Sequence, residues 1–405
     1  MLTDHMKKSI LYIHQYFKTP KEPGGTRSYW LAQELIENGY NVTMITTSNT
    51  IRNSVEKTII DGINVIYLKV DYSQEMTILR RLFSFISFML KSTYYAFLQK
   101  NIDLVFATST PLSVGFPALI IKKIKNIPYV FEVRDLWPEV PIQMGAISNN
   151  LVKKLFIWSE KLIYKNAKHV VALSPGMAKG VLKYTSTSKV SMIPNMSKID
   201  LFWPREKNLD LMKRLGLNTN SFKIIHFGSL GIANGALTII ESAKLLKNND
   251  DFEFVFIGGG STEYELKDLC TKYNLNNVHF LGAFTLDETS EIVNLCEVSI
   301  ISFLDLPILA TNSPNKLFDS LSAGKPIIVN SAGWTKDLVE KYSCGFYVNP
   351  NYPDELATKV LQLKENANMM KIMSDNGRLL AETVYDKSIL CNEFLNVINK
   401  VVHEK

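Results

Sequence analysis

The feature that most constrains the fold of this chain is a regular alternation of short β-rich runs with helical stretches. SILYIHQYF (9–17) and FKIIHFGSL (222–230) each open a series of six such runs. This alternation is typical of parallel sheets covered by helices, so the sequence predicts an α/β fold with two doubly wound, Rossmann-like domains of six strands each. The other runs are 40–47, 63–70, 103–109, 127–135 and 169–174 in the first series, and 252–260, 278–284, 298–304, 325–331 and 345–349 in the second.

The length of the chain also indicates two domains. It has 405 residues, and a single hydrophobic core stops growing at about 250–300 residues. The join is expected within 190–222, where IPNMSKIDLFWPREKNL is rich in Pro and Asn. We predict an N-terminal domain over 1–200, a second domain over 201–380, and a helical tail over 381–405 that packs back towards the first domain.

The net charge of +6 is divided unevenly. Residues 1–195 hold 24 Lys and Arg against 13 Asp and Glu, whereas residues 196–405 hold 21 against 26. A basic half predicts an anionic partner. The sequence shows no helix-turn-helix, zinc-finger or RNP-like signature, so an anionic membrane surface is a better candidate than nucleic acid.

Two segments of the basic half have the composition of membrane-surface helices. Segments 76–100 and 151–165 mix Lys or Arg with apolar and aromatic residues, including Phe83, Phe85 and Phe88. Their uncharged runs are much shorter than the roughly 20 residues that span a bilayer. A helix lying at the interface, with these three aromatic residues entering the membrane, is one interpretation. The other, equally open, is that each apolar face packs on the sheet.

Cysteine and metal motifs give no sign of a cofactor. The four cysteines are scattered, and the sequence has no CxxC, HExxH, EF-hand or DxD pattern. We therefore expect no metal, no disulfide framework and a reducing, cytoplasmic location. No signal peptide is apparent.

Glycines follow the first strand of each predicted domain. In parallel sheets ligands bind beyond the carboxyl ends of the strands, so these turns are candidate sites. Gly24 and Gly25 precede a helix expected to start at Thr26, and Gly228 and Gly231 begin a GxxGxxxG pattern. That spacing is neither the GxGxxG dinucleotide fingerprint nor a Walker A loop, which disfavours a dehydrogenase.

The stretch SPNKLFDSLSAGKPIIV (313–329) carries the most specific signal. Ser313 is expected to cap a helix that starts at Pro314, with Lys316 in its first turn and Asp319 on the same face. A lysine there is unfavourable unless an anion is bound. Together the two residues would suit a nucleotide, because Lys316 could bind the diphosphate and Asp319 could accept hydrogen bonds from the ribose hydroxyls. The alternative is an ordinary exposed pair of opposite charges three residues apart on the helix.

Four stretches occur in the order found in retaining glycosyltransferases of family 4, and the chain resembles that family over nearly its whole length. They are PGGTRSYWLAQEL, HFGSLGIANGALTIIESAKLL, VHFLGAFTLDE and SPNKLFDSLSAGKPIIV. The resemblance implies the GT-B fold, with two Rossmann-like domains facing across a cleft. IHQYF, GGTRS and FEVRDLWPE look closest to bacterial N-acetyl-L-fucosamine transferases of O-antigen and capsule synthesis.

The resemblance implies a UDP-sugar donor and a role for each matching residue. Lys316 would meet the pyrophosphate beside Leu317, and Asp319 would hold the ribose. The other residues that it places around the donor are Gly25, Gly228, Gly231, Ala283 and Phe284. The chain departs from the family pattern in two places. Thr311 and Asp319 replace a pair of glutamates eight residues apart, so the first carboxylate is absent and the second is shorter, and Ile232, Ala233 and Asn234 stand where a cation is expected.

The resemblance also implies a mechanism. Retention of configuration in a chain without an evident nucleophile suggests front-side attack by the acceptor. Lys316 would stabilise the leaving group, and Asp135 or Glu139 would orient the acceptor hydroxyl. Asp135 could equally pair with Arg134 to brace a loop. His14 and His226 are expected to be core histidines rather than catalytic groups.

The function implied is transfer of a sugar, such as N-acetyl-L-fucosamine, to a polyprenyl-diphosphate-linked saccharide at the cytoplasmic face of a membrane. Two alternatives remain at this point: a nucleotide-sugar epimerase of the same fold, and a non-enzymatic module that binds nucleotide sugars or membranes.

Overall fold

The computed structural model describes residues 7–73 and 76–404. Contacts between Cα atoms divide the chain into two compact units. Unit 1 comprises Met1–Thr19, Gly25–Pro194 and Ser388–Lys405, and unit 2 comprises Pro20–Gly24 and Asn195–Lys387. Each unit contains one sheet flanked by helices, as the alternating pattern predicts.

The sheet of unit 1 has eight strands in the order β3-β4-β2-β1-β5-β6-β7-β8. All its neighbours pair in parallel except β3 and β4. In the central register, Ile10 of β1 lies between Val42 of β2 and Leu104 of β5. The strands are β1 Ser9–His14, β2 Asn41–Ser48, β3 Val55–Ile60, β4 Ile63–Lys69, β5 Leu104–Thr108, β6 Tyr129–Val133, β7 His169–Ala172 and β8 Val190–Met192.

The prediction of six strands in the first half is wrong, because β3 and β8 were missed. β3 reads VEKTII and is an outer antiparallel strand whose residues are mostly exposed, so it lacks the apolar run of a buried parallel strand. β8 has only three residues, none of them buried. The other six strands of unit 1 lie where the sequence predicts them.

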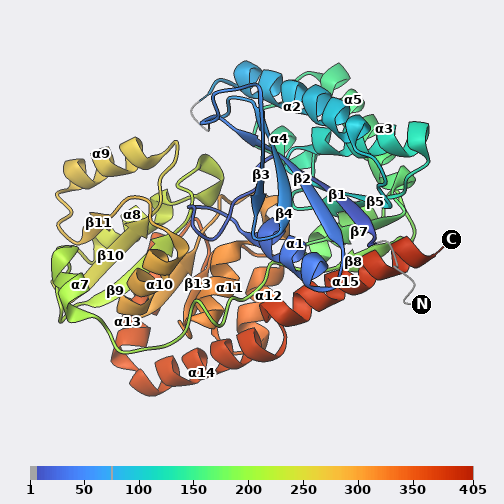
Figure 1. Ribbon diagram of the computed structural model, residues 1–405. Helices are drawn as coiled ribbons and strands as arrows, with labels where there is room; N and C mark the ends of the chain where they lie inside the picture. The colour runs from blue at the N-terminus through green and yellow to red at the C-terminus, as the bar shows by residue number, and fades with distance from the viewer. Residues whose placement is uncertain (1–6, 74–75, 405) are drawn as a thin grey trace, which may run out of the picture. The chain divides into compact units, whose positions relative to one another are not determined.

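Helices cover both faces of this sheet: α2, α3 and α5 lie on one face, and α1 and α15 on the other (Figure 1). α15 runs from the end of unit 2 into unit 1, where Phe394 packs on Phe106 and Tyr40 bonds to Asn399. The helices are α1 Arg27–Glu37, α2 Ile78–Leu98, α3 Gly115–Lys125, α4 Glu139–Gln143, α5 Asn150–Asn166, α6 Pro175–Val181 and α15 Lys387–His403, with short 3₁₀ turns η1 Leu112–Val114 and η2 Thr187–Lys189.

Unit 2 has an entirely parallel sheet of six strands in the order β11-β10-β9-β12-β13-β14, which confirms the six predicted runs. The order reverses beside β9, the first strand, so β9 and β12 flank a topological switch point where ligands bind in such sheets. The strands are β9 Phe222–Phe227, β10 Phe252–Ile257, β11 Val278–Phe280, β12 Val298–Ile301, β13 Ile327–Val329 and β14 Gly345–Tyr347.

Two apolar cores fill the faces of the second sheet. One lies beneath α8, α9 and α13, and the other beneath α10 with Phe202 and Met212. The helices are α7 Leu209–Arg214, α8 Leu237–Leu245, α9 Glu263–Tyr273, α10 Leu286–Leu295, α11 Asn315–Ser322, α12 Trp334–Lys341, α13 Pro353–Glu365 and α14 Ala367–Thr383, with 3₁₀ turns η3 Ile232–Asn234 and η4 Leu309–Thr311.

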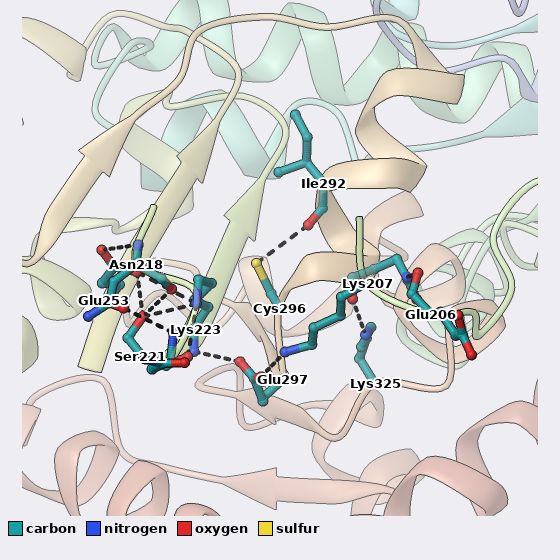
Figure 2. A network of polar contacts seen from close by, with 12 residues as sticks. Glu206, Lys207, Asn218, Ser221, Lys223, Glu253, Ile292, Cys296, Glu297 and Lys325 are labelled. Carbon is teal, nitrogen blue, oxygen red and sulfur yellow. Dashed lines mark hydrogen bonds and ion pairs between the residues drawn. The ribbon is translucent and has the colours of Figure 1, made fainter. Parts of the chain in front are cut away.

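Charged side chains at the amino edge of this sheet are paired with one another (Figure 2). Lys223, fully buried in β9, donates to the carbonyl and hydroxyl of Ser221 at 2.9 Å and lies 3.7 Å from Glu253. Lys325, which precedes β13, donates to the carbonyl of Asn294 at 3.1 Å. These contacts satisfy the buried groups locally, which contrasts with the opposite edge of the same sheet.

Candidate functional site

A buried lysine without a counter-ion lies at the carboxyl edge of the second sheet. Lys316, in the first turn of α11, is 8% exposed. Its Nζ donates to Asn234 Oδ1 at 3.1 Å and lies 3.3 Å from His226 Nε2. Among residues 7–73 and 76–404, no carboxylate forms an ion pair with it. Because a buried charge is costly unless it is paired, this arrangement suits an anionic ligand.

The electrostatics of Lys316 and His226 are linked. Burial lowers the pKa of Lys316 to about 7. Burial, together with the Lys316 cation, holds the pKa of His226 well below its usual value. His226 is therefore a neutral imidazole at pH 7, and its Nε2 can accept a hydrogen bond from the Lys316 ammonium. The histidine that the sequence analysis treats as a core residue thus lies in direct contact with the candidate anion site.

Two glycines leave open backbone beside this lysine. Gly228 follows β9 with φ 109°, and a Cβ there would lie 3.7 Å from Cε of Lys316. A Cβ on Gly258, where φ is 111°, would lie 2.0 Å from the Gly228 carbonyl oxygen. The turn therefore requires glycine at both positions, and it leads through Gly231 to η3, which ends at Asn234.

Asp319 lies one helical turn after Lys316 but faces a different partner. Its carboxylate is 4% exposed and forms an ion pair with Lys198, from the segment after β8. Burial raises the pKa of Asp319, and the Lys198 ammonium opposes that rise. Lys316 and Asp319 are therefore not the exposed pair that the sequence leaves open as an alternative.

The start of α11 differs from the sequence prediction. Ser313 does not cap the helix: its hydroxyl accepts a hydrogen bond from the Asn195 amide at 3.2 Å, and the helix begins at Asn315 after Pro314. Leu317 is fully buried, and its amide donates to the Pro314 carbonyl at 3.1 Å. Thr311, which replaces the first family glutamate, ends η4, and its hydroxyl donates to the Ile308 carbonyl.

The loop after β11 holds the two residues expected at the base. Ala283 is exposed, and Phe284 is half-buried against the core beneath α10. They follow the outermost strand of the sheet, two strands away from β9.

In unit 1 the residues proposed for catalysis lie after β6. Asp135 accepts a hydrogen bond from Thr110 Oγ1 at 2.7 Å, and burial raises the pKa of its carboxyl. Arg134 lies 3.4 Å from His14 Nε2. Glu139 is the first residue of α4.

A second buried acid faces Glu139. Burial, and then the nearby Glu139 carboxylate, raise the pKa of Glu160 in α5 to about 8. Glu160 is 1% exposed. Glu160 is therefore mostly protonated at pH 7, which avoids a second buried negative charge beside Glu139.

The glycine turn of unit 1 is fixed by an arginine that the sequence analysis missed. Gly25 is half-buried and lies two residues before α1, which Arg27 begins. The Arg27 guanidinium is 2% exposed, donates to Glu132 at 2.9 Å and donates to the carbonyl of Ile193 at 3.0 Å. This contact ties the start of α1 to β6 and to the end of unit 1.

Three residues of these sites carry no local sequence signal. Arg27 and Glu132 are 105 positions apart, and Lys198 lies 121 positions before Asp319. The sequence analysis names Asn234 only as one of three residues that stand where the family pattern has a cation. In the described chain, no group of three or more His, Cys, Asp and Glu side chains is arranged to hold a metal ion.

Comparison with known proteins places this geometry in context. A model described as "Glycosyl transferase 4-like domain" matches residues 24–196, and one described as "Glycosyl transferases group 1" matches residues 208–380. An uncharacterized glycosyltransferase from Methanocaldococcus jannaschii is 27% identical over 128 residues, which are 32% of this chain and 35% of that relative. The match therefore spans about a third of that relative's length.

Two solved structures are similar over almost the full chain. Sucrose-phosphate synthase from Thermosynechococcus elongatus has a TM-score of 0.79 and 16% identity, covering 98% of this chain and all of that one. Anabaena HepE, solved in complex with UDP and glucose, has a TM-score of 0.71 and 18% identity, covering 96% and 99%.

Proposed function

This chain belongs to the glycosyltransferases of the GT-B fold, and we propose that it transfers a sugar from a UDP-linked donor to a lipid-linked saccharide. The observation that carries the proposal is Lys316, a buried cation beside the glycine turn at Gly228. A diphosphate supplies the counter-charge that Lys316 lacks. The HepE complex with UDP supports the choice of nucleotide, and no metal is needed in this scheme.

We assign the steps of a retaining transfer as follows. The bond between C1 of the donor sugar and the β-phosphate oxygen breaks, and the acceptor oxygen bonds to C1 from the same face. The acceptor's hydroxyl proton passes to that phosphate oxygen. Lys316 stabilises the charge on the departing UDP, which is the kind of contribution that dominates such reactions. Asp135 or Glu139 orients the acceptor hydroxyl.

The finer identity of the substrates rests on the sequence resemblance. IHQYF and FEVRDLWPE favour N-acetyl-L-fucosamine as the sugar and a polyprenyl-diphosphate-linked saccharide of O-antigen or capsule synthesis as the acceptor. Such an acceptor is embedded in a membrane, so the enzyme must work at the membrane surface.

The outward face of unit 1 supports membrane contact. The buried residues of α2 are Ser84, Phe88, Ser92 and Ala96, and many of its other large apolar residues are exposed. Phe83 is 73% exposed, and Leu155 of α5 is 59% exposed. Lysines and arginines flank these positions in both helices, which suits an anionic bilayer. No helix of the described chain is long and apolar enough to span a bilayer.

Two of the aromatic residues expected to enter the membrane do not face it. Phe88 is fully buried, so its predicted insertion is wrong. Phe85 is half-buried and packs between Tyr72 and Trp137. Phe85 therefore faces the loops after β4 and β6, and of the three aromatic residues Phe83 alone is exposed.

We expect the double substitution Phe83→Ser and Leu155→Ser to weaken binding to vesicles that contain phosphatidylglycerol. Each apolar side chain contributes about 1.5–3 kcal/mol when it is fully removed from water, so the loss should be at least about tenfold. Co-sedimentation with vesicles measures it. Ile59→Ser is the control, since Ile59 is 69% exposed on β3. Equal binding of all three proteins would contradict membrane contact through α2 and α5.

UDP binding should take up a proton at pH 8. Free Lys316, with a pKa of about 7, is then mostly neutral, whereas a bound diphosphate favours the ammonium. The complex thus holds more protons than the free protein, and UDP affinity falls as pH rises above 7. His226 is neutral throughout this range. The heat of UDP binding measured by calorimetry should differ between Tris and HEPES buffers for the wild type, and should be equal in the two buffers for Lys316→Met. Equal wild-type heats in the two buffers would contradict the assignment of proton uptake to Lys316.

The proposed reaction is tested by incubating the protein with UDP-N-acetyl-L-fucosamine and membranes that carry lipid-linked saccharides. We expect the sugar to enter the lipid fraction with release of UDP. A new soluble nucleotide sugar formed from the donor alone would instead identify an epimerase. Unchanged donor with every lipid acceptor would contradict transfer from this donor.

A further inference from the structure

Lys198 and Asp319 form a buried ion pair whose role no sequence motif assigns. Both side chains are about nine-tenths or more buried, at 5% and 6% exposure. The Lys198 ammonium also lies 5.7 Å from the centre of the Phe202 ring. Removing one partner of such a pair leaves an uncompensated buried charge, so the protonation state of Asp319 depends on Lys198.

The backbone on both sides of Lys198 is fixed against α11 and the chain near residue 385. The Ser197 amide donates to the Tyr385 carbonyl at 2.7 Å, and the Ser197 hydroxyl donates to the Phe318 carbonyl at 3.1 Å. Arg378 of α14 donates to the carbonyls of Phe202 and Ser322 at 3.0 and 2.6 Å. The lysine is therefore presented to Asp319 by a braced segment rather than by a mobile loop.

We propose that Lys198 is a positioning residue of the donor site, which keeps Asp319 ionised and oriented to accept the ribose hydroxyls of UDP. The inference rests on the proposed UDP site. Burial alone favours the neutral acid, whose proton would occupy one acceptor position. Asp319 is also one methylene shorter than the glutamate of the family pattern, so a fixed partner compensates for its shorter reach.

Other charged groups near this pair are already paired or lie on the same helix. Asp200, beside Lys198, forms an ion pair with Lys387 at 2.8 Å. Lys316 lies three residues before Asp319 and faces His226. The charge that faces Asp319 is therefore that of Lys198.

The test compares UDP with 2′-deoxy-UDP, because only UDP offers both ribose hydroxyls. Calorimetry at pH 6 and pH 8 gives the ratio of the affinities for UDP and 2′-deoxy-UDP. Both nucleotides carry the same diphosphate, so any change in diphosphate binding cancels in this ratio. We expect the wild type to prefer UDP by about tenfold or more, as for a hydrogen bond to a charged group. Asp319→Asn should reduce this preference at both pH values.

The Lys198 variants separate positioning from a purely structural role. Lys198→Met should lower the preference, and lower it more at pH 6 than at pH 8, because burial raises the pKa of Asp319 and the Lys198 ammonium no longer opposes that rise; Lys198→Arg should retain the preference. Asp200→Asn is the matched control and should behave like the wild type. Because the ratio is measured on folded protein, a loss of stability does not change it.

Three results would overturn the inference. If Lys198→Met keeps the wild-type ratio at both pH values while Asp319→Asn loses it, Lys198 has no positioning role although the donor site stands. If the wild type binds UDP but Asp319→Asn leaves the ratio unchanged, the ribose contact itself is wrong. If the wild type binds neither nucleotide, the proposed function falls together with the inference.

Discussion

Replacing Lys316 with methionine should weaken UDP binding by about ten- to a hundredfold, as expected for the loss of a charged hydrogen bond of about 1.5–3 kcal/mol. The same substitution should raise the thermal midpoint of unfolding, because it removes a buried cation that forms no ion pair with any carboxylate of the described residues. Binding and stability would then change in opposite directions. Calorimetric titration and a thermal melt of the same samples measure both.

Lys325→Met is the matched control for this prediction. Burial also lowers the pKa of Lys325, to about 8, but this lysine precedes β13 at the amino edge of the same sheet and donates to Asn294 (Figure 2). We expect the UDP affinity of the Lys325→Met variant to equal that of the wild type. Equal losses of affinity in the two variants would show that lysine substitutions act through the fold, and the anion site at Lys316 would be contradicted.

Arg27→Met should give the largest loss of stability in unit 1. The guanidinium donates to Glu132 at 2.9 Å, and both side chains are almost completely buried, at 1% and 0% exposure. Breaking a buried pair by removing one partner destabilises proteins by about 3–5 kcal/mol, since the other charge stays buried. Chemical denaturation followed by circular dichroism should show this loss.

Two further variants show whether the loss comes from the unpaired Glu132. The double variant Arg27→Met with Glu132→Met should recover part of the stability, because no charge is then left without a partner. Lys168→Met, which breaks an exposed pair with Glu404, should have little effect. If Arg27→Met is no more harmful than Lys168→Met, the buried pair does not hold the start of α1 to β6.

The sequence is sufficient for most of the fold because buried parallel strands carry an unambiguous signal. The six strands of unit 2 and the central strands of unit 1 lie within runs rich in apolar, β-branched and aromatic residues, and all lie where they were predicted. β3 fails because an outer strand such as VEKTII mixes polar and apolar residues on both faces and has no buried residue. β8 fails because VSM lies between Lys189 and Pro194 and is not part of a longer apolar run.

The site is predictable only where its residues are close in sequence. The segment from Pro314 to Asp319 indicates a charged helix start, and the structure places Lys316 at the carboxyl edge of the sheet. Periodicity cannot show that both charged residues are buried, or that Asp319 faces Lys198, because the segment after β8 reaches α11 only through the tertiary fold. The same limit applies to His226, whose strand position looks identical to that of a core residue.

Calorimetric titration with UDP, GDP and NAD⁺ in the presence of EDTA should show whether unit 2 binds the UDP part of a sugar donor. We expect UDP to bind most tightly, GDP to bind more weakly, and NAD⁺ not to bind. Without UDP binding under these conditions, Lys316 and Gly228 would not form a donor site, and the proposed transfer from UDP would be contradicted.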